Sequence, residues 1–202
     1  MTTTTDRYEY RAFARNFGIV EQRLRARILE PRLQESRESY IVSATVAAHN
    51  VKIRGGLLDI KSLVGSPHGL ERWTPALKTP LPVADADAER KIIAALDTAP
   101  PPGGLGQYDE RSFIEQWVRR QPGLVAAAVF KRRLTGRVGG CLCEMTEVAI
   151  NGAWCMTACV ESVEWREVLA VAAELGVAAY ANENYVQAIR RVTGLVPATA
   201  VY

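Results

Sequence analysis

Residues 50–61 read NVKIRGGLLDIK, and this stretch decides the expected fold. Side chains in a β-strand point alternately to its two faces, so Lys52 and Arg54 share a face. The adjacent glycines Gly55-Gly56 suit a two-residue turn that folds the stretch into a hairpin. One face of this hairpin then gathers three cations and one acid: Lys52, Arg54, Asp59 and Lys61.

The alternation returns in residues 129–133, VFKRR, which places Lys131 and Arg133 on one face of a later strand. A soluble barrel normally fills its interior with apolar side chains, whereas a cationic interior indicates a bound polyanion, most simply a chain of phosphates. The alternative is a one-sided sheet whose polar face meets water. For any single strand this second interpretation is the simpler one.

Bulk properties set broad limits. The chain has 202 residues and a net charge of +3, which is too small to indicate a nucleic-acid partner. No segment has the length and apolarity of a transmembrane helix, so no membrane partner is expected. Residues 1–6 lack the basic and apolar regions of a signal peptide, which favours the cytoplasm.

Four cysteines lie in apolar stretches of sequence that have the pattern of β-strands: Cys141, Cys143, Cys155 and Cys159. In a reducing cytosol they are expected to be free thiols. A zinc site is the alternative, but the first pair has one intervening residue where zinc motifs usually have two to four. Small buried core residues are therefore the preferred interpretation.

Strands and helices are predicted from period-2 and helical spacing of apolar residues, with a type I′ turn at Asn151-Gly152. The expected strands are 8–14, 39–48, 50–54, 58–61, 70–77, 124–134, 140–150 and 153–162. The expected helices are 17–29, 85–96, 109–120, 164–175 and 182–193. The Pro- and Gly-rich segment 100–106 is expected to connect parts of one domain that spans residues 1–202.

This order of elements resembles the CYTH or triphosphate tunnel metalloenzyme superfamily. The resemblance extends over about residues 6–195 and rests on an ordered set of short stretches: 52–54, 58–61, 131–133, 144–148, 157–161 and 182–185. It implies an α+β fold, a closed or nearly closed antiparallel barrel of about eight strands with helices packed outside. Members bind triphosphate-type ligands inside this tunnel.

The first strand departs from the superfamily pattern of two glutamates and a lysine on alternate positions. Here Arg7, Glu9 and Arg11 occupy those positions, so Arg7 replaces the first acid. Mg²⁺ prefers carboxylate oxygens, and the loss of one weakens a metal site. Taken alone, Glu9 is better explained as a surface residue in contact with a neighbouring arginine.

Two later acids, Glu144 and Glu161, match acidic positions of the superfamily. Thr146 and Cys159 stand where further acids are frequent. A register shift of one residue reverses the faces of a strand, so Glu147 is an alternative to Glu144. Glu71 is a weaker candidate.

The resemblance implies a division of roles between two sets of side chains. Binding of divalent Mg²⁺ or Mn²⁺ and the catalytic function are assigned to Glu9, Glu144 and Glu161. Binding of the phosphate oxygens is assigned to Arg11, Lys52, Arg54, Lys61, Lys131 and Arg133.

The leading hypothesis is a metal-dependent, triphosphatase-like hydrolase of inorganic triphosphate, or of a related polyphosphate or nucleoside triphosphate. One alternative is a non-catalytic module that binds polyphosphate or a nucleotide, and a second is a class IV-type adenylate cyclase. The expected partner is a triphosphate- or polyphosphate-type small molecule. The hypothesis leaves a homodimer open.

Overall fold

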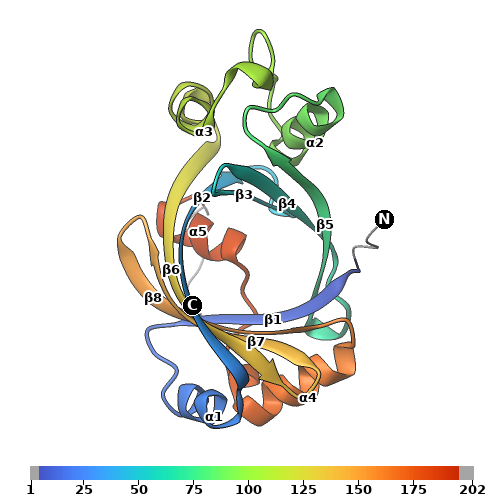
Figure 1. Cartoon of the computed structure of the whole chain (residues 1–202), viewed down its shortest axis with the longest axis vertical. Coiled ribbons are helices and arrows are strands. Elements are labelled where there is room, and N and C mark those ends of the chain that lie inside the picture. The colour runs from blue at the N-terminus through green and yellow to red at the C-terminus, as the bar shows by residue number, and fades with distance from the viewer. Residues whose placement is uncertain (1–4, 196–202) are drawn as a thin grey trace. The chain divides into compact units, whose positions relative to one another are not determined.

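The computed structural model describes residues 5–195, and these form an α+β fold around a closed barrel of eight strands. Every strand pair with an assigned register is antiparallel. Figure 1 shows the ring, which confirms the barrel expected from the sequence. Around it the strands follow the order β1 (Arg7–Ala14), β5 (Glu71–Pro80), β4 (Leu57–Gly65), β3 (His49–Arg54), β2 (Leu29–Ser43), β6 (Leu124–Val138), β7 (Cys141–Ile150) and β8 (Ala153–Ser162), and β8 pairs with β1.

The helices lie close to the positions expected from apolar spacing. They are α1 (Ile19–Arg27), α2 (Ala86–Leu96), α3 (Glu110–Ser112), α4 (Trp165–Leu175) and α5 (Tyr185–Thr193). After α3 the chain continues through a π-helical turn and a 3₁₀ turn to Arg120, so the predicted helix at 109–120 is present in an irregular form. Within residues 5–195 no helix combines the length and apolarity needed to span a membrane.

The described residues form two compact units, each built from three segments of the chain. Residues 5–37, 63–74 and 129–184 make up the first unit, and residues 38–62, 75–128 and 185–195 the second. The segment 100–106 lies within the second unit, where Leu105 is buried and its amide donates to a Glu89 carboxylate oxygen. That one domain spans residues 1–202 stays a prediction.

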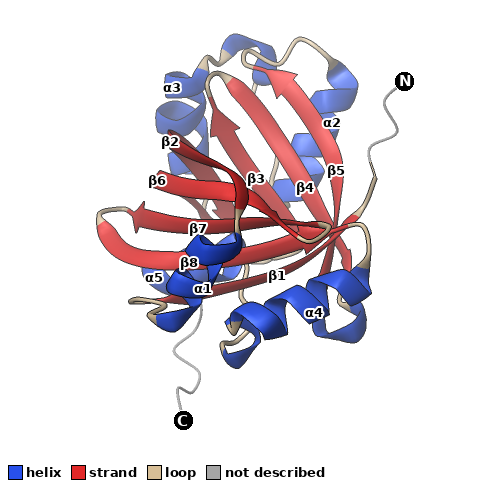
Figure 2. Cartoon of the chain, turned by 60° about the horizontal axis from the view of Figure 1, so that its bottom comes forward, coloured by secondary structure: helices blue, strands red, loops and turns tan. Residues whose placement is uncertain are grey.

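In the first unit, α1 and α4 cover one face of strands β1, β7 and β8, as Figure 2 shows. The apolar residues beneath them alternate along the strands, for example Cys143, Met145 and Val160. The residues between them point to the opposite face, because side chains alternate. We call this opposite face of the first unit the site face.

The second unit has its own apolar core on one face of the β3–β4 hairpin. Ile53 and Ile60 pack there with Ile92 of α2 and with Phe113 and Trp117 of the following helical segment. Lys52 and its neighbours therefore lie on the other face of the hairpin. Tyr40, opposite Lys52 in the β2–β3 ladder, stacks on Tyr185 at the start of α5, with ring centroids 5.5 Å apart.

The hairpin predicted from residues 50–61 is confirmed. Gly55 and Gly56 form its turn with positive φ values of 57° and 74°, a backbone conformation that favours glycine. Lys52 lies opposite Asp59 in the resulting ladder.

The expected strand at 39–48 differs most from the structure. β2 begins at Leu29 and ends at Ser43. Most of its residues before Ser39 are exposed and polar, so the buried alternation that signals a strand is present only in its second half.

Candidate functional site

The register of β7 determines which of its acids belongs to the site face. Glu144 lies opposite Cys159 of β8 and Thr135 of β6. It shares its face with Thr146, while the buried Met145 packs under the helices. Glu147 lies on the Met145 side and pairs with the exposed Arg132, at 2.9 Å. Glu144, rather than Glu147, is therefore the acid of the site face.

Arg11 of β1 is the centre of this face and is only 7 % exposed. Its Nε donates to a carboxylate oxygen of Glu9 at 2.9 Å, and its Nη1 donates to Glu144 at 3.0 Å. The same Nη1 donates to the hydroxyl of Thr157 at 3.3 Å. One guanidinium thus joins two of the three acids that the sequence assigned to a metal.

Two further cations lie around Glu144. Arg133 Nη1 is 4.0 Å from a carboxylate oxygen of Glu144, and Lys131 is buried, with 3 % exposure. Burial alone would raise the pKa of Glu144, but the positive charges of Arg11, Lys131 and Arg133 outweigh it and hold this pKa at about 2. Glu144 is therefore ionised at neutral pH and neutralises part of a cationic cluster.

Glu161, the third predicted metal ligand, also pairs with an arginine. It accepts a hydrogen bond from Arg7 at 2.9 Å. Arg7 stands where the superfamily pattern has an acid, so this departure in sequence becomes an ion pair in the structure.

The expected carboxylate site for Mg²⁺ or Mn²⁺ does not match this geometry. Glu9, Glu144 and Glu161 each accept from a guanidinium. Among residues 5–195, no group of three or more His, Cys, Asp or Glu side chains is placed to hold a metal ion. The acids lie on the expected face, but one carboxylate oxygen of each accepts from an arginine.

Glu71 of β5 lies opposite Glu9 in the β1–β5 ladder and is 7 % exposed. It accepts from Asn184 Nδ2 at 2.6 Å and from Trp73 Nε1 at 3.1 Å. Burial, reinforced by the charge of Glu9, raises its pKa above the usual value despite these hydrogen bonds.

The segment 182–184, similar to the superfamily tail, holds β1 and β5 in place. Asn182 Oδ1 accepts from the backbone N–H of Arg11 at 2.9 Å, and the N–H of Glu183 donates to the carbonyl of Arg11 at 2.7 Å. Asn182 Nδ2 donates to the carbonyl of Gly69 at 2.9 Å. Both backbone groups of Arg11 are therefore fixed by this segment. Sequence reasoning noted the tail but gave these residues no role.

Two small side chains of the site face complete the cluster. Thr146 is fully buried, and within the described residues its hydroxyl makes no hydrogen bond. Cys159 is a buried free thiol. Burial raises the pKa of Cys159, which keeps it protonated and a poor nucleophile.

The second unit carries a separate charged cluster around Lys52. Lys52 Nζ lies 3.7 Å from Glu38 and 4.0 Å from Asp59, and Arg54 Nη1 lies 3.3 Å from Glu38. Burial lowers the pKa of Lys52, the two acids oppose this shift, and the charges of Arg54 and Lys61 add to it. The hairpin therefore brings its three cations together, as predicted.

Glu38 was missed by sequence reasoning, although its side chain is completely buried. Its position in the long polar half of β2 gave no alternating signal.

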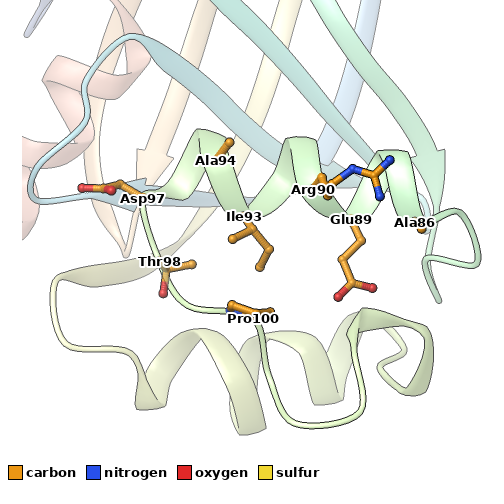
Figure 3. A pocket seen from close by; sticks show the side chains of 8 residues that line it. All are labelled: Ala86, Glu89, Arg90, Ile93, Ala94, Asp97, Thr98 and Pro100. Atoms are coloured by element: carbon orange, nitrogen blue, oxygen red, sulfur yellow. The ribbon is translucent and has the colours of Figure 1, made fainter.

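A cavity of about 610 Å³ on α2 lies in the second unit and is lined by none of the predicted site residues (Figure 3). Its walls include Glu89, Arg90, Ile93 and Asp97. The charged clusters described above are therefore the better candidates for function.

Comparison with solved structures identifies the fold. One match is a Hippeastrum protein described as a proposed adenylyl cyclase with a dominant triphosphatase activity, at a TM-score of 0.50 and 14 % identity over 95 % of this chain and 98 % of that one. A conserved hypothetical protein from Pyrococcus furiosus matches at a TM-score of 0.50 and 13 % identity, over 89 % and 98 % of the two chains. The chain has the fold of the CYTH-type, triphosphate tunnel proteins.

Sequence comparison adds no closer relative. No protein-family profile matches the chain, and no curated protein matches it in sequence.

Proposed function

We propose that this chain, which has the triphosphate tunnel fold, binds a triphosphate-type anion on the site face of its first unit. The ligand class is inorganic triphosphate or the triphosphate group of a nucleotide. The groups that bind it are the cations Arg11, Lys131 and Arg133 and the hydroxyls of Thr146 and Thr157.

The main support for this proposal is the burial of cations on the site face. Lys131 and Arg11 are almost fully buried, and taking such charges out of water is costly unless they are paired. The charges of Arg11, Lys131 and Arg133 all act on the carboxylate of Glu144, so three cations lie close together on this face. A phosphate chain is the kind of ligand that several converging cations bind.

The individual side chains suit phosphate oxygens in different ways. Arg133 presents a planar fork that can donate two parallel hydrogen bonds, while Lys131 acts as a compact point charge. Thr146 adds a buried hydroxyl that bonds to no other described residue. Thr146 lies opposite Arg133 of β6 on one side and opposite Thr157 of β8 on the other.

The geometry favours binding over metal-dependent hydrolysis. Hydrolysis through Mg²⁺ or Mn²⁺ needs carboxylate oxygens that bind the metal, whereas each of the three predicted ligands already accepts a hydrogen bond from an arginine. The dominant triphosphatase activity described for the Hippeastrum protein keeps hydrolysis as the second candidate.

The proposal also includes three cations of the second unit. Lys52, Arg54 and Lys61 are predicted to bind the phosphate chain as well. This prediction is supported by the clustering of these cations on one face of the β3–β4 hairpin. Lys61→Ala tests it separately from changes in the first unit.

The test is calorimetric titration with inorganic triphosphate, ATP and long-chain polyphosphate, first in EDTA and then with Mg²⁺ or Mn²⁺. Orthophosphate serves as the control ligand. We expect triphosphate to bind in EDTA and orthophosphate to bind much more weakly, because a single phosphate cannot contact several cations at once. No binding of any triphosphate compound would refute the proposal.

Product assays on the same samples separate the three functions. A binding module releases nothing. A triphosphatase releases orthophosphate, and an adenylate cyclase converts ATP to cyclic AMP and pyrophosphate. Metal-dependent phosphate release that is lost in Glu144→Gln would establish the hydrolase instead.

A further inference from the structure

We infer that Arg11 is a built-in replacement for a divalent metal ion, so that the acids of the site face are closed to Mg²⁺ and Mn²⁺. This inference concerns the acids alone and does not rest on the proposed binding of triphosphate.

The first argument is the position of the guanidinium. Arg11 donates to Glu9 through Nε and to Glu144 through Nη1, at 2.9 and 3.0 Å. A metal ion shared by these two carboxylates would have to bridge them, at about 2.0–2.1 Å for Mg²⁺, where the guanidinium now bridges them by hydrogen bonds. The arginine and the metal therefore compete for one place.

The second argument is that Arg11 is held in place along its backbone. Asn182 Oδ1 accepts from its N–H, and its carbonyl accepts from the N–H of Glu183. The hydroxyl of Thr157, which accepts from Arg11 Nη1, is a third partner of the side chain. Displacing the guanidinium would break several hydrogen bonds in a buried environment, where each lost partner is costly.

The third argument is chemical. An arginine side chain keeps its proton under all conditions relevant to proteins, so it cannot become neutral to admit a cation. A metal ion entering beside it would meet a full positive charge at short range. Lysine, which can lose its proton when buried, would be a weaker barrier.

The third predicted metal ligand also has an arginine partner, although this arginine is half-exposed. Glu161 pairs with Arg7, the residue found at the superfamily's first acidic position. The substitution therefore removes one metal-binding carboxylate and also supplies a cation to another.

Mn²⁺ binding without any phosphate compound tests the inference. The signal of free aqueous Mn²⁺ in electron paramagnetic resonance falls when the ion binds to protein. We compare the wild type, Glu144→Gln, Arg11→Met, and the double variant Arg11→Met/Glu144→Gln. Arg132→Gln is the matched control, because Arg132 forms a similar ion pair on the other face of the barrel wall.

We expect no Mn²⁺ binding by the wild type or by Arg132→Gln. Arg11→Met leaves Glu9 and Glu144 without their shared cation and should gain Mn²⁺ affinity by at least ~10-fold, a scale typical of changes around metal ligands. The double variant should lose that gain. Circular dichroism and thermal unfolding verify that each variant is folded.

Mn²⁺ binding by the wild type that is lost in Glu144→Gln would overturn the inference. A folded Arg11→Met that binds no Mn²⁺ would overturn it as well, because the arginine would then not be the barrier. If Arg11→Met does not fold, Arg11→Lys takes its place. It retains one contact and should show a weaker gain in Mn²⁺ affinity, and the absence of any gain would again count against the inference.

Because phosphate is absent from this experiment, its result is separate from that of the proposed function. A wild type that binds Mn²⁺ and triphosphate refutes only the metal inference. A wild type that binds neither refutes only the anion site.

Discussion

Arg132 and Arg133 are neighbours on β6 that point to opposite faces, and this makes them a matched pair for mutation. Arg133 lies near Glu144 on the site face, while Arg132 pairs with the exposed Glu147. We expect Arg133→Ala to weaken triphosphate binding by about 1–3 kcal/mol, the usual contribution of a hydrogen bond to a charged group. Calorimetric titration in EDTA measures the change.

Arg132→Ala is the control for this change and should leave triphosphate affinity nearly unaltered. It removes the same charge from the adjacent position, so it corrects for any effect of net charge. Equal losses of affinity in the two variants would show that the site face makes no direct contact with the anion.

The low pKa of Glu144 predicts how stability depends on pH. In the unfolded chain this carboxyl titrates near its ordinary value of 4.5, and in the folded protein at about 2. Since the folded pKa is the lower one, the stabilisation is complete above about 4.5 and is lost as pH falls toward 2. Its size is about 3 kcal/mol, given ~1.4 kcal/mol for each pKa unit.

Urea denaturation at several pH values tests this prediction with Glu144→Gln. The variant should be less stable than the wild type at pH 7, and the difference should shrink between about pH 4.5 and pH 2. Glu147→Gln, whose partner is exposed, should change stability by about 0–1 kcal/mol. A difference for Glu144→Gln that stays constant with pH would contradict the assignment.

The sequence predicted which residues lie on the site face more readily than which of them form ion pairs with one another. Alternation placed Glu9 and Arg11 on one face, and both are found there. The pairing of Glu144 with Arg11 depends on how β1 aligns with β8 and β8 with β7. The register of β1 with β8 joins segments far apart in the chain, and a shift of one residue in β7 would have exchanged Glu144 for Glu147.

At the scale of elements, the short segment 182–184 has a larger role than its length suggests. Asn184 is 2 % exposed and donates to the buried Glu71. We expect Asn184→Ala to destabilise the protein by about 1–3 kcal/mol, because a buried carboxyl group loses a hydrogen-bond partner. Urea denaturation measures this loss.

Gln116→Ala, at an exposed position of the second unit, is the control for Asn184→Ala and should change stability by less than about 0.5 kcal/mol. The pKa of Glu71, already raised by burial, should rise further in Asn184→Ala, since the hydrogen bond from Asn184 lowers it. The added destabilisation should therefore be greater at pH 8 than at pH 5. A loss independent of pH would exclude Glu71 as its cause.

Elements with strong alternation or turn chemistry were predicted well. The β3–β4 hairpin, β7 and β8 lie where the sequence placed them. The first half of β2 was missed, because its exposed polar residues show no period-2 burial. Glu38 was lost with it, since a buried acid within a polar run looks like any surface residue.

At the scale of the whole molecule, closure of the barrel depends on the pairing of β1 with β8. Tyr8 lies opposite Ser162, and Ala14 lies opposite Met156. A fragment of residues 1–98 lacks β6, β7 and β8, so its β1 would be left without one partner strand. We expect this fragment to be insoluble or to unfold without cooperativity, as an unpaired edge favours aggregation.

Expression of residues 1–98, followed by thermal unfolding monitored by circular dichroism, provides the measurement. The full chain should show one cooperative transition under the same conditions. A soluble fragment with its own sharp transition would show that the chain contains independently folding parts, against the expectation of one domain.

The contacts of Asn182 with Arg11 also have a consequence for the time at which the site comes into being. These residues are separated by 171 positions in sequence. At a translation rate of about 5–20 residues per second, Arg11 is made roughly 9–34 s before Asn182. During that interval Glu9 and Arg11 are already made, whereas Glu144 and then Thr157 are added later and the segment 182–184 comes last. The site face is therefore complete only in the finished chain, and an anion that binds to it as proposed cannot guide the early steps of folding on the ribosome.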